Sequence, residues 1–241
     1  GIAAPLTALG FDCALHDNPV DGAGPLLVAR RHEDAARPTV LIYGHGDTVD
    51  GQDARWRDGL SPFALTAEDG RLYGRGTADN KGQHWINLAA LRTVIESRGR
   101  LGFNVTILLE TDEEMGSRGL ADFCADNRDL LAADVLITDY SSAMFDYAIL
   151  DRPIVIYAPD AAAYAMARGV YFDITAEPPG AVATTFGHLL DVFRTGAVDD
   201  DAAAKARTQF RGRFCHLDDG HAAERVVRRA LLGEPAPPAA R

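Results

Sequence analysis

Three short apolar runs, each followed at once by a polar cluster, constrain the fold most strongly. Residues 39–43 (TVLIY) end at GHGD, residues 104–109 (NVTILL) end at ETDEEMGS, and residues 134–138 (DVLIT) end at Asp139. Apolar residues recur at helical spacing between the first two runs, namely Trp85, Leu88, Leu91, Val94 and Ile95. Strands that alternate with helices predict an α/β layered fold, in which functional sites gather beyond the carboxyl ends of the strands.

The same pattern continues in the second half of the chain. We expect a helix over 142–150, a strand over 153–157, a helix over 184–194 capped by Thr184 or Thr185, and terminal helices over 202–214 and 219–232. Residues 1–139 hold 13 Lys and Arg against 22 Asp and Glu, whereas residues 140–241 hold 11 against 13. This change in charge predicts a boundary after residue 139, with a second segment over 140–234 and a disordered tail over 235–241.

Composition excludes several classes of protein. The formal net charge of −11 argues against a nucleic-acid binder. The three cysteines, Cys13, Cys124 and Cys215, are too far apart to suggest a disulfide framework or a cysteine zinc site. The sequence contains neither an apolar run of about 18 residues nor the pattern of a signal peptide, so we expect a cytoplasmic protein.

Four polar clusters contain side chains that could bind a metal ion. They are His45 with Asp47, Asp79 in GRGTADNKG, the pair Glu113 and Glu114, and Asp139. Taken singly, a histidine at a strand end or a surface glutamate pair is more often structural or solvated than a ligand. Together, one imidazole and several carboxylates suit Zn²⁺.

The sequence around these clusters resembles a known family. YGHGDTVDGQDARWRDGLSPFALTAEDGRLYGRGTADNKG, followed by ILLETDEEMGSRGL, is similar to the co-catalytic zinc peptidases, which include aminoacylases, dipeptidases and desuccinylases. The resemblance covers residues 5–139. It implies a three-layer αβα catalytic domain and hydrolysis of an amide bond in a small peptide or N-acyl amino acid.

The resemblance also implies a role for each candidate residue. His45 and Asp139 would bind one zinc ion, Asp79 would bridge two, and Glu114 would bind the second. Asp47 would orient the imidazole of His45, and Glu113 would act as the general base. The family usually has a cis peptide after the bridging aspartate, which predicts one at Asp79–Asn80.

Two parts of the zinc-peptidase pattern have no counterpart after residue 140. They are the inserted lid or dimerisation domain and the final histidine ligand. His188, His216 and His221 do not lie in a similar sequence context. We therefore expect one or two zinc ions.

A second resemblance begins at residue 134. DVLITDYSSAMFDYAILDRPIVIYAPDAAAYAMARGVYFD, followed by FRGRFCHLDDGHAAERVV, is similar to the C-terminal part of CDP-glycerol glycerophosphotransferases, the teichoic-acid glycerol-phosphate polymerases. It covers residues 134–235 and implies a Rossmann-like half of a GT-B-type fold. It implies donor contacts from five residues: Asp139, Ser141, Ser142, Arg168 and Gly169.

The residues of this second segment agree with phosphate binding. Ser141 and Ser142 follow a strand and open a helix, where free N–H groups and the helix dipole favour a diphosphate. Arg168 would add a charged clamp, and Gly169 would allow close approach of the backbone. The alternative is that one of the serines is only an N-cap.

Three hypotheses about function follow. The first is a zinc-dependent hydrolase acting on a small-molecule substrate. The second is a glycerophosphotransferase-like protein of teichoic-acid synthesis that binds a CDP-linked polyol, the one hypothesis under which we expect peripheral membrane association. The third is a non-catalytic chimera. Residues 134–139 satisfy both family patterns, and the chain lacks an essential part of each.

Overall fold

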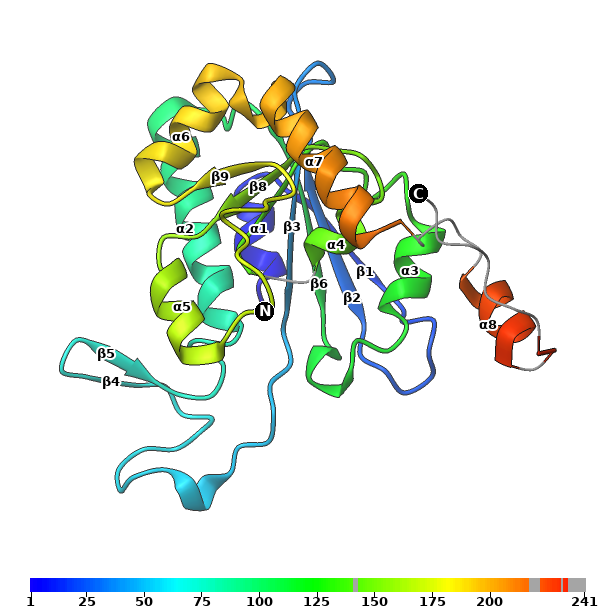
Figure 1. Cartoon of the computed structure of the whole chain (residues 1–241). Helices are drawn as coiled ribbons and strands as arrows, with labels where there is room; N and C mark the ends of the chain where they lie inside the picture. The colour runs from blue at the N-terminus through cyan, green and yellow to red at the C-terminus, as the bar shows by residue number, and fades with distance from the viewer. Residues whose placement is uncertain (141–142, 217–221, 231, 234–241) are drawn as a thin grey trace. The chain divides into compact units, whose positions relative to one another are not determined.

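The computed structural model describes residues 1–140, 143–216, 222–230 and 232–233 (Figure 1). The chain divides into two compact units, Gly1–Ala133 and Asp134–Arg241. Residues 134–139 thus fall in the second unit, because β7 (Leu136–Thr138) pairs with β8 (Ile154–Tyr157) and with no strand of the first unit among the described residues.

The first unit is built on a four-stranded mixed sheet in the order β1-β2-β6-β3. Its strands are β1 (Asp12–His16), β2 (Leu26–Arg31), β3 (Thr39–His45) and β6 (Asn104–Glu110). Strands β3 and β6 are parallel, and β2 is antiparallel to β6. A separate hairpin joins β4 (Thr66–Glu68) to β5 (Arg71–Tyr73).

Helices cover both faces of this sheet. α1 (Ala3–Ala8) and α2 (Lys81–Arg98) contribute Leu6, Leu88 and Leu91 to one core cluster, while α3 (Leu120–Asp126) contributes Phe123 to the other. Strand β2 serves both, because Leu27 and Ala29 face the first cluster and Leu26 and Val28 face the second. The first unit therefore has three layers.

The second unit repeats this plan on a smaller scale. Its parallel sheet has the order β7-β8-β9, with β9 at Ala181–Ala183. On one face α4 (Ala143–Ala148) and α7 (Asp201–Phe214) pack Met144 and Phe210 against Ile154 and Ile156. On the other, α6 (Phe186–Thr195) packs Val192 against Val155. The remaining helices are α5 (Ala161–Arg168) and α8 (Ala222–Ala230).

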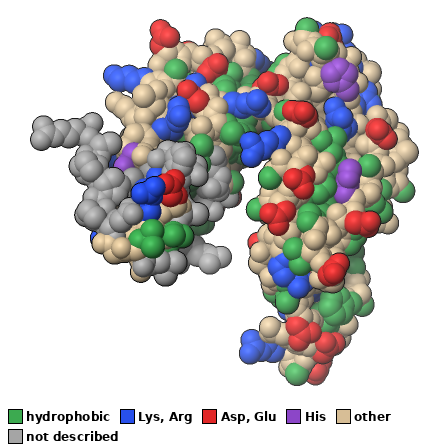
Figure 2. Space-filling view, turned by 90° about the vertical axis from the view of Figure 1, so that its right-hand side faces the viewer, with side chains coloured by type: hydrophobic (Ala, Val, Ile, Leu, Met, Phe, Trp, Pro, Cys, Tyr) green, Lys and Arg blue, Asp and Glu red, His purple; other side chains and the backbone are tan. Residues whose placement is uncertain are grey.

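Both units are α/β, as the sequence predicts, and the expected helices lie close to their predicted ranges. The predicted tail over 235–241, the first residue of the helix predicted over 142–150 and part of the one over 219–232 lie outside the described residues. Acidic and basic side chains are interspersed on the face shown in Figure 2, so the net charge does not form one continuous acidic surface there.

Candidate metal centre

The carboxyl ends of β3 and β6 bring the first two polar clusters together. The strands are parallel, and His45 lies opposite Glu110 in their register. The loops that follow both strands therefore begin at the same edge of the sheet (Figure 1). Gly44, just before His45, is required by packing, because a Cβ atom there would lie 2.3 Å from Cε1 of His84.

The imidazole of His45 is buried and faces carboxylates. It is 6% exposed. Its Nε2 lies 2.9 Å from Oδ1 of Asp79 and 3.9 Å from Oε2 of Glu113, and its Nδ1 lies 3.3 Å from Oδ1 of Asp47. Asp47 also accepts a hydrogen bond from the backbone N–H of Glu114 at 3.0 Å, which ties the two loops together.

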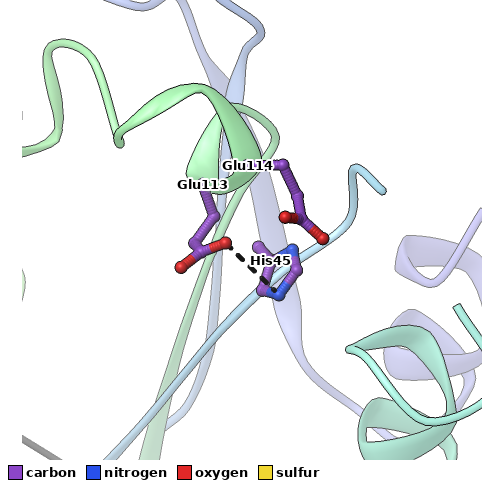
Figure 3. Close-up of side chains that lie close together, drawn as sticks. All are labelled: His45, Glu113 and Glu114. Atoms are coloured by element: carbon purple, nitrogen blue, oxygen red, sulfur yellow. Dashed lines mark ion pairs between the residues drawn. The ribbon is translucent and has the colours of Figure 1, made fainter. Parts of the chain in front are cut away.

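Glu113 and Glu114 come from one short 3-10 helix, η2 (Glu113–Met115), and both carboxylates lie close to His45 (Figure 3). One potential ligand atom from each of these three residues lies within 4.8 Å of the others. These three residues form a group that could hold a metal ion, and Asp79 lies beside them against Nε2 of His45.

The electrostatics of the cluster favour a cation. Burial alone would lower the pKa of His45, but the hydrogen bond with Asp79 and the charges of Glu113, Asp79 and Asp47 together raise it. The carboxylates that stabilise a proton on the imidazole ring would also stabilise a divalent cation bound beside it. One imidazole with several carboxylates is a donor set that suits Zn²⁺, so these residues fit the implied metal.

The loop that carries Glu113 and Glu114 is held at both ends. Glu110, 2% exposed, accepts hydrogen bonds from the hydroxyl groups of Tyr43 on β3 and Ser117 after η2. Burial and the hydrogen bond to Glu110 raise the pKa of Tyr43. Asp112 receives two side-chain hydrogen bonds from Arg118, at 2.6 and 2.7 Å, and these lower its pKa.

The segment that carries Asp79 supports His45 from the other side. The Asp79–Asn80 peptide is cis, as predicted. Oδ1 of Asn80 accepts a hydrogen bond from the backbone N–H of His45 at 3.2 Å, and Nε2 of buried His84 donates to the carbonyl of His45 at 2.8 Å. Burial lowers the pKa of His84, which suits a neutral donor.

Sequence analysis assigned no role to His84, Asn80 or Glu110. A signal for His84 was present, because it shares a helical face with Leu88 and Leu91, which face the core. Glu110 and Asn80 carry no comparable signal, since their contacts depend on the pairing of distant segments.

The remaining predicted residues belong to the second unit. Asp139 follows β7, and Gly169 follows α5 with φ of 71°. Ser141, Ser142 and the side chain of Arg168 lie outside the described residues. The donor contacts of these positions and the pairing of Asp139 with His45 stay predictions.

Tyr140 and Gly169 line a pocket of about 310 Å³ in the second unit, with Met144, Phe145 and Phe172 among its apolar residues. The ring of Tyr140 stacks on Tyr164 with centroids 4.0 Å apart, and its hydroxyl group donates to Asp160 at 2.9 Å. Gly169 is thus the one position predicted to contact a donor that lines this pocket among the described residues.

Comparison with known proteins finds two groups of relatives. A family model described as CDP-glycerol:poly(glycerophosphate) glycerophosphotransferase matches residues 112–232, half of the chain. The teichoic acid poly(glycerol phosphate) polymerase of Bacillus subtilis is 31% identical over 178 residues, which are 71% of this chain and 24% of the polymerase. The family match begins at residue 112, upstream of residue 134, whereas the resemblance described in the sequence begins at residue 134.

The other group consists of peptidases. The cysteinylglycine-S-conjugate dipeptidase of Corynebacterium striatum is 37% identical over 137 residues, 56% of this chain and 29% of the dipeptidase. The crystal structure of human carnosine dipeptidase 1 matches with a TM-score of 0.50 and 27% identity over 65% of this chain and 31% of that one. An M20 family metallo-carboxypeptidase from Sulfolobus solfataricus matches with a TM-score of 0.51 and 29% identity, over 58% of this chain and 32% of that one.

These matches support the two resemblances seen in the sequence and the α/β fold. The chain spans about a quarter to a third of the relatives' own lengths. Among the described residues, no helix is both long and apolar enough to cross a membrane.

Proposed function

The chain belongs to the CDP-glycerol:poly(glycerophosphate) glycerophosphotransferase family over residues 112–232, and it also contains a stretch similar to a dipeptidase and to a metallo-carboxypeptidase. We propose that the first unit of the chain is a zinc-dependent hydrolase of a small amide or peptide bond. The substrate class is a dipeptide or an N-acyl amino acid. The observation that carries the proposal is the convergence of His45, Glu113 and Glu114 at the carboxyl ends of two parallel strands.

His45 would hold one zinc ion through Nε2, Glu114 would hold the second where two bind, and Asp79 would be a ligand of both. Bound zinc would polarise the scissile carbonyl and lower the pKa of an attacking water. Asp47 would fix the ring of His45 through Nδ1, the partner that such imidazole ligands usually have.

Glu113 would move the proton. Its carboxylate lies within the cluster but is partly exposed, which leaves room for water and substrate beside it. It would accept a proton from water as the C–O bond forms, and then donate that proton to the amine nitrogen as the C–N bond breaks. The backbone hydrogen bond from Glu114 to Asp47 would keep η2 at the correct distance from His45.

The test is hydrolysis of a panel of dipeptides and N-acyl amino acids by the zinc-loaded chain. We expect turnover that Glu113→Gln lowers by about 10² to 10⁴, because the amide cannot accept the proton. Glu96→Gln, at an exposed position of α2, is the matched control and should leave the rate unchanged. Absence of turnover on every member of a broad panel would contradict the proposal.

A second candidate function is binding of a CDP-linked polyol by the second unit. It is supported by the family match and by the pocket that Tyr140 and Gly169 line. We expect CDP-glycerol to bind in the presence of a metal chelator, and Ser141→Ala/Ser142→Ala to weaken binding, as measured by calorimetry. If the chain shows neither hydrolysis nor donor binding, the non-catalytic chimera remains.

A further inference from the structure

A polar pocket lies at the opposite end of β3 from His45. It has a volume of about 360 Å³ and is formed by the loop between β2 and β3 and by the turn between α2 and β6. In Figure 1 the β2–β3 loop lies at the top of the drawing, whereas β3 leads down to the loop that follows His45. Three arginines, Arg31, Arg37 and Arg100, line the pocket together with His32 and the acidic residues Glu33 and Asp34.

The β2–β3 loop is fixed by one buried side chain. Asn104, which is 3% exposed, accepts hydrogen bonds through Oδ1 from the backbone N–H groups of Glu33 and Asp34, at 2.8 and 3.1 Å. Its Nδ2 donates to the carbonyls of Asp34 and Arg37, at 2.8 and 2.9 Å. All four polar contacts of this amide therefore shape the loop that carries Arg37.

The opposite wall is fixed by Glu33. Its two carboxylate oxygens accept hydrogen bonds from the backbone N–H groups of Leu101 and Gly102, both at 2.8 Å. The turn that carries Arg100 lies between Gly99 and Gly102, whose φ values of 71° and 87° favour glycine. The backbone on either side of the pocket is thus held in place without a ligand.

The charges in the pocket are unequally paired. Glu33 is already occupied by the two N–H groups and by Nε of Arg31 at 3.0 Å, and Arg31 also donates to the carbonyl of Leu9 at 2.5 Å. Arg37 and Arg100 have no ion pair among the described residues. Two guanidinium groups without an ion pair thus share the pocket with one further carboxylate, that of Asp34, which accepts a hydrogen bond from the backbone N–H of Ala36 at 2.9 Å.

We propose that this pocket binds the phosphate group of a small-molecule ligand between Arg37 and Arg100. A guanidinium group presents parallel N–H donors that match a phosphate bidentately, and two of them from separate loops would bind three or four of its oxygens. The site is distinct from the candidate metal centre, and the proposal does not depend on hydrolysis by the first unit.

The test is titration of the full chain with inorganic phosphate in the presence of a chelator, followed through backbone amide shifts in NMR spectra. We expect saturable shifts confined to residues 33–37 and 99–102, which separates this pocket from any phosphate bound by the second unit. Arg37→Gln/Arg100→Gln should weaken binding by at least about tenfold, since both charged hydrogen-bond donors to the phosphate are removed.

Arg71→Gln/Arg92→Gln is the matched control, because it removes the same charge at exposed positions away from the pocket. It should leave the affinity unchanged, whereas Arg37→Lys/Arg100→Lys should bind phosphate more weakly than wild type, because lysine loses the bidentate geometry. The proposal is overturned if these amides do not respond to phosphate, if the control weakens binding equally, or if acetate binds as tightly as phosphate.

Discussion

Each ring nitrogen of His45 faces a carboxylate, and its backbone is bound on both sides. Asp47 lies beside Nδ1 and Asp79 beside Nε2, while Asn80 and His84 bind the backbone N–H and carbonyl. An imidazole restrained in this way does not need to reorganise when a cation replaces its proton. The carboxylate of Asp47 therefore orients the ring of His45, and a substitution of Asp47 measures this contribution.

We predict that Asp47→Asn lowers the zinc affinity of the chain about 10- to 100-fold, because the amide no longer provides a charged partner for Nδ1 of His45. Competition with a chromogenic chelator measures the change. Asp50→Asn, three residues along the same loop and exposed, should bind zinc as wild type does. Equal affinities of Asp47→Asn and wild type would show that the contact does not position the ligand.

A second residue-scale prediction concerns Asp151 in the second unit. Hydrogen bonding from buried Arg207, with the charges of Arg211 and Arg207, holds the pKa of Asp151 below its ordinary value. Since the folded pKa is depressed, the stabilisation is complete above the unfolded pKa of about 3.9 and is lost as pH falls towards the folded value. We expect Asp151→Asn to flatten the acid limb of the stability curve.

Denaturant titrations between about pH 2 and 6 test this prediction. Asp191→Asn is the control, because Asp191 and Arg194 form a 3.5 Å pair in which both side chains are mostly exposed. Exposed pairs of this kind contribute little to stability. An acid limb that Asp151→Asn leaves as steep as in wild type would refute the prediction.

At the scale of helices and strands, sequence pattern predicted β3 and β6 but neither β1 nor β2, although four residues of β2 are buried. The runs at 39–43 and 104–109 became β3 and β6, and all seven residues of β6 are buried. Strand β1 has no buried residue, so its sequence carries no alternating apolar signal. It is an edge strand held by pairing with β2, which a single segment cannot reveal.

The sequence leaves open whether Thr184 or Thr185 caps α6, and the structure shows that Thr185 does. Oγ1 of Thr185 accepts a hydrogen bond from the backbone N–H of His188 at 3.1 Å. We predict that Thr185→Ala lowers the free energy of unfolding by about 1 kcal/mol, whereas Thr184→Ala costs less than about 0.5 kcal/mol. Chemical denaturation of both variants measures this, and equal losses would contradict the assignment.

At the scale of the whole molecule, each unit has its own hydrophobic core. The clusters around Leu88 and Phe123 draw on residues before 134, and those around Ile154 and Val155 on residues after it. The α/β fold and the grouping of His45 with Glu113 and Glu114 could be predicted from sequence, because strand ends and residue types are local features. The contacts of Glu110, Asn104 and His84 could not, since each joins segments far apart in the chain.

Two cores predict two unfolding transitions in calorimetry, since chains with separate cores need not unfold in one step. Zinc should raise the temperature of only one transition, because a ligand stabilises the unit that binds it, by about 2.7 kcal/mol at 100 times its Kd. The second transition serves as the internal control. A single transition, or an equal shift of both, would show that the units do not unfold independently.

The most direct test of the central claim is the zinc content of the chain, measured by elemental mass spectrometry after purification without chelator. The metal centre predicts at least one zinc ion per chain, lost in His45→Ala and retained in His188→Ala, whose side chain is exposed on α6. A wild-type chain without zinc, or a His45→Ala variant that keeps it, would contradict the account.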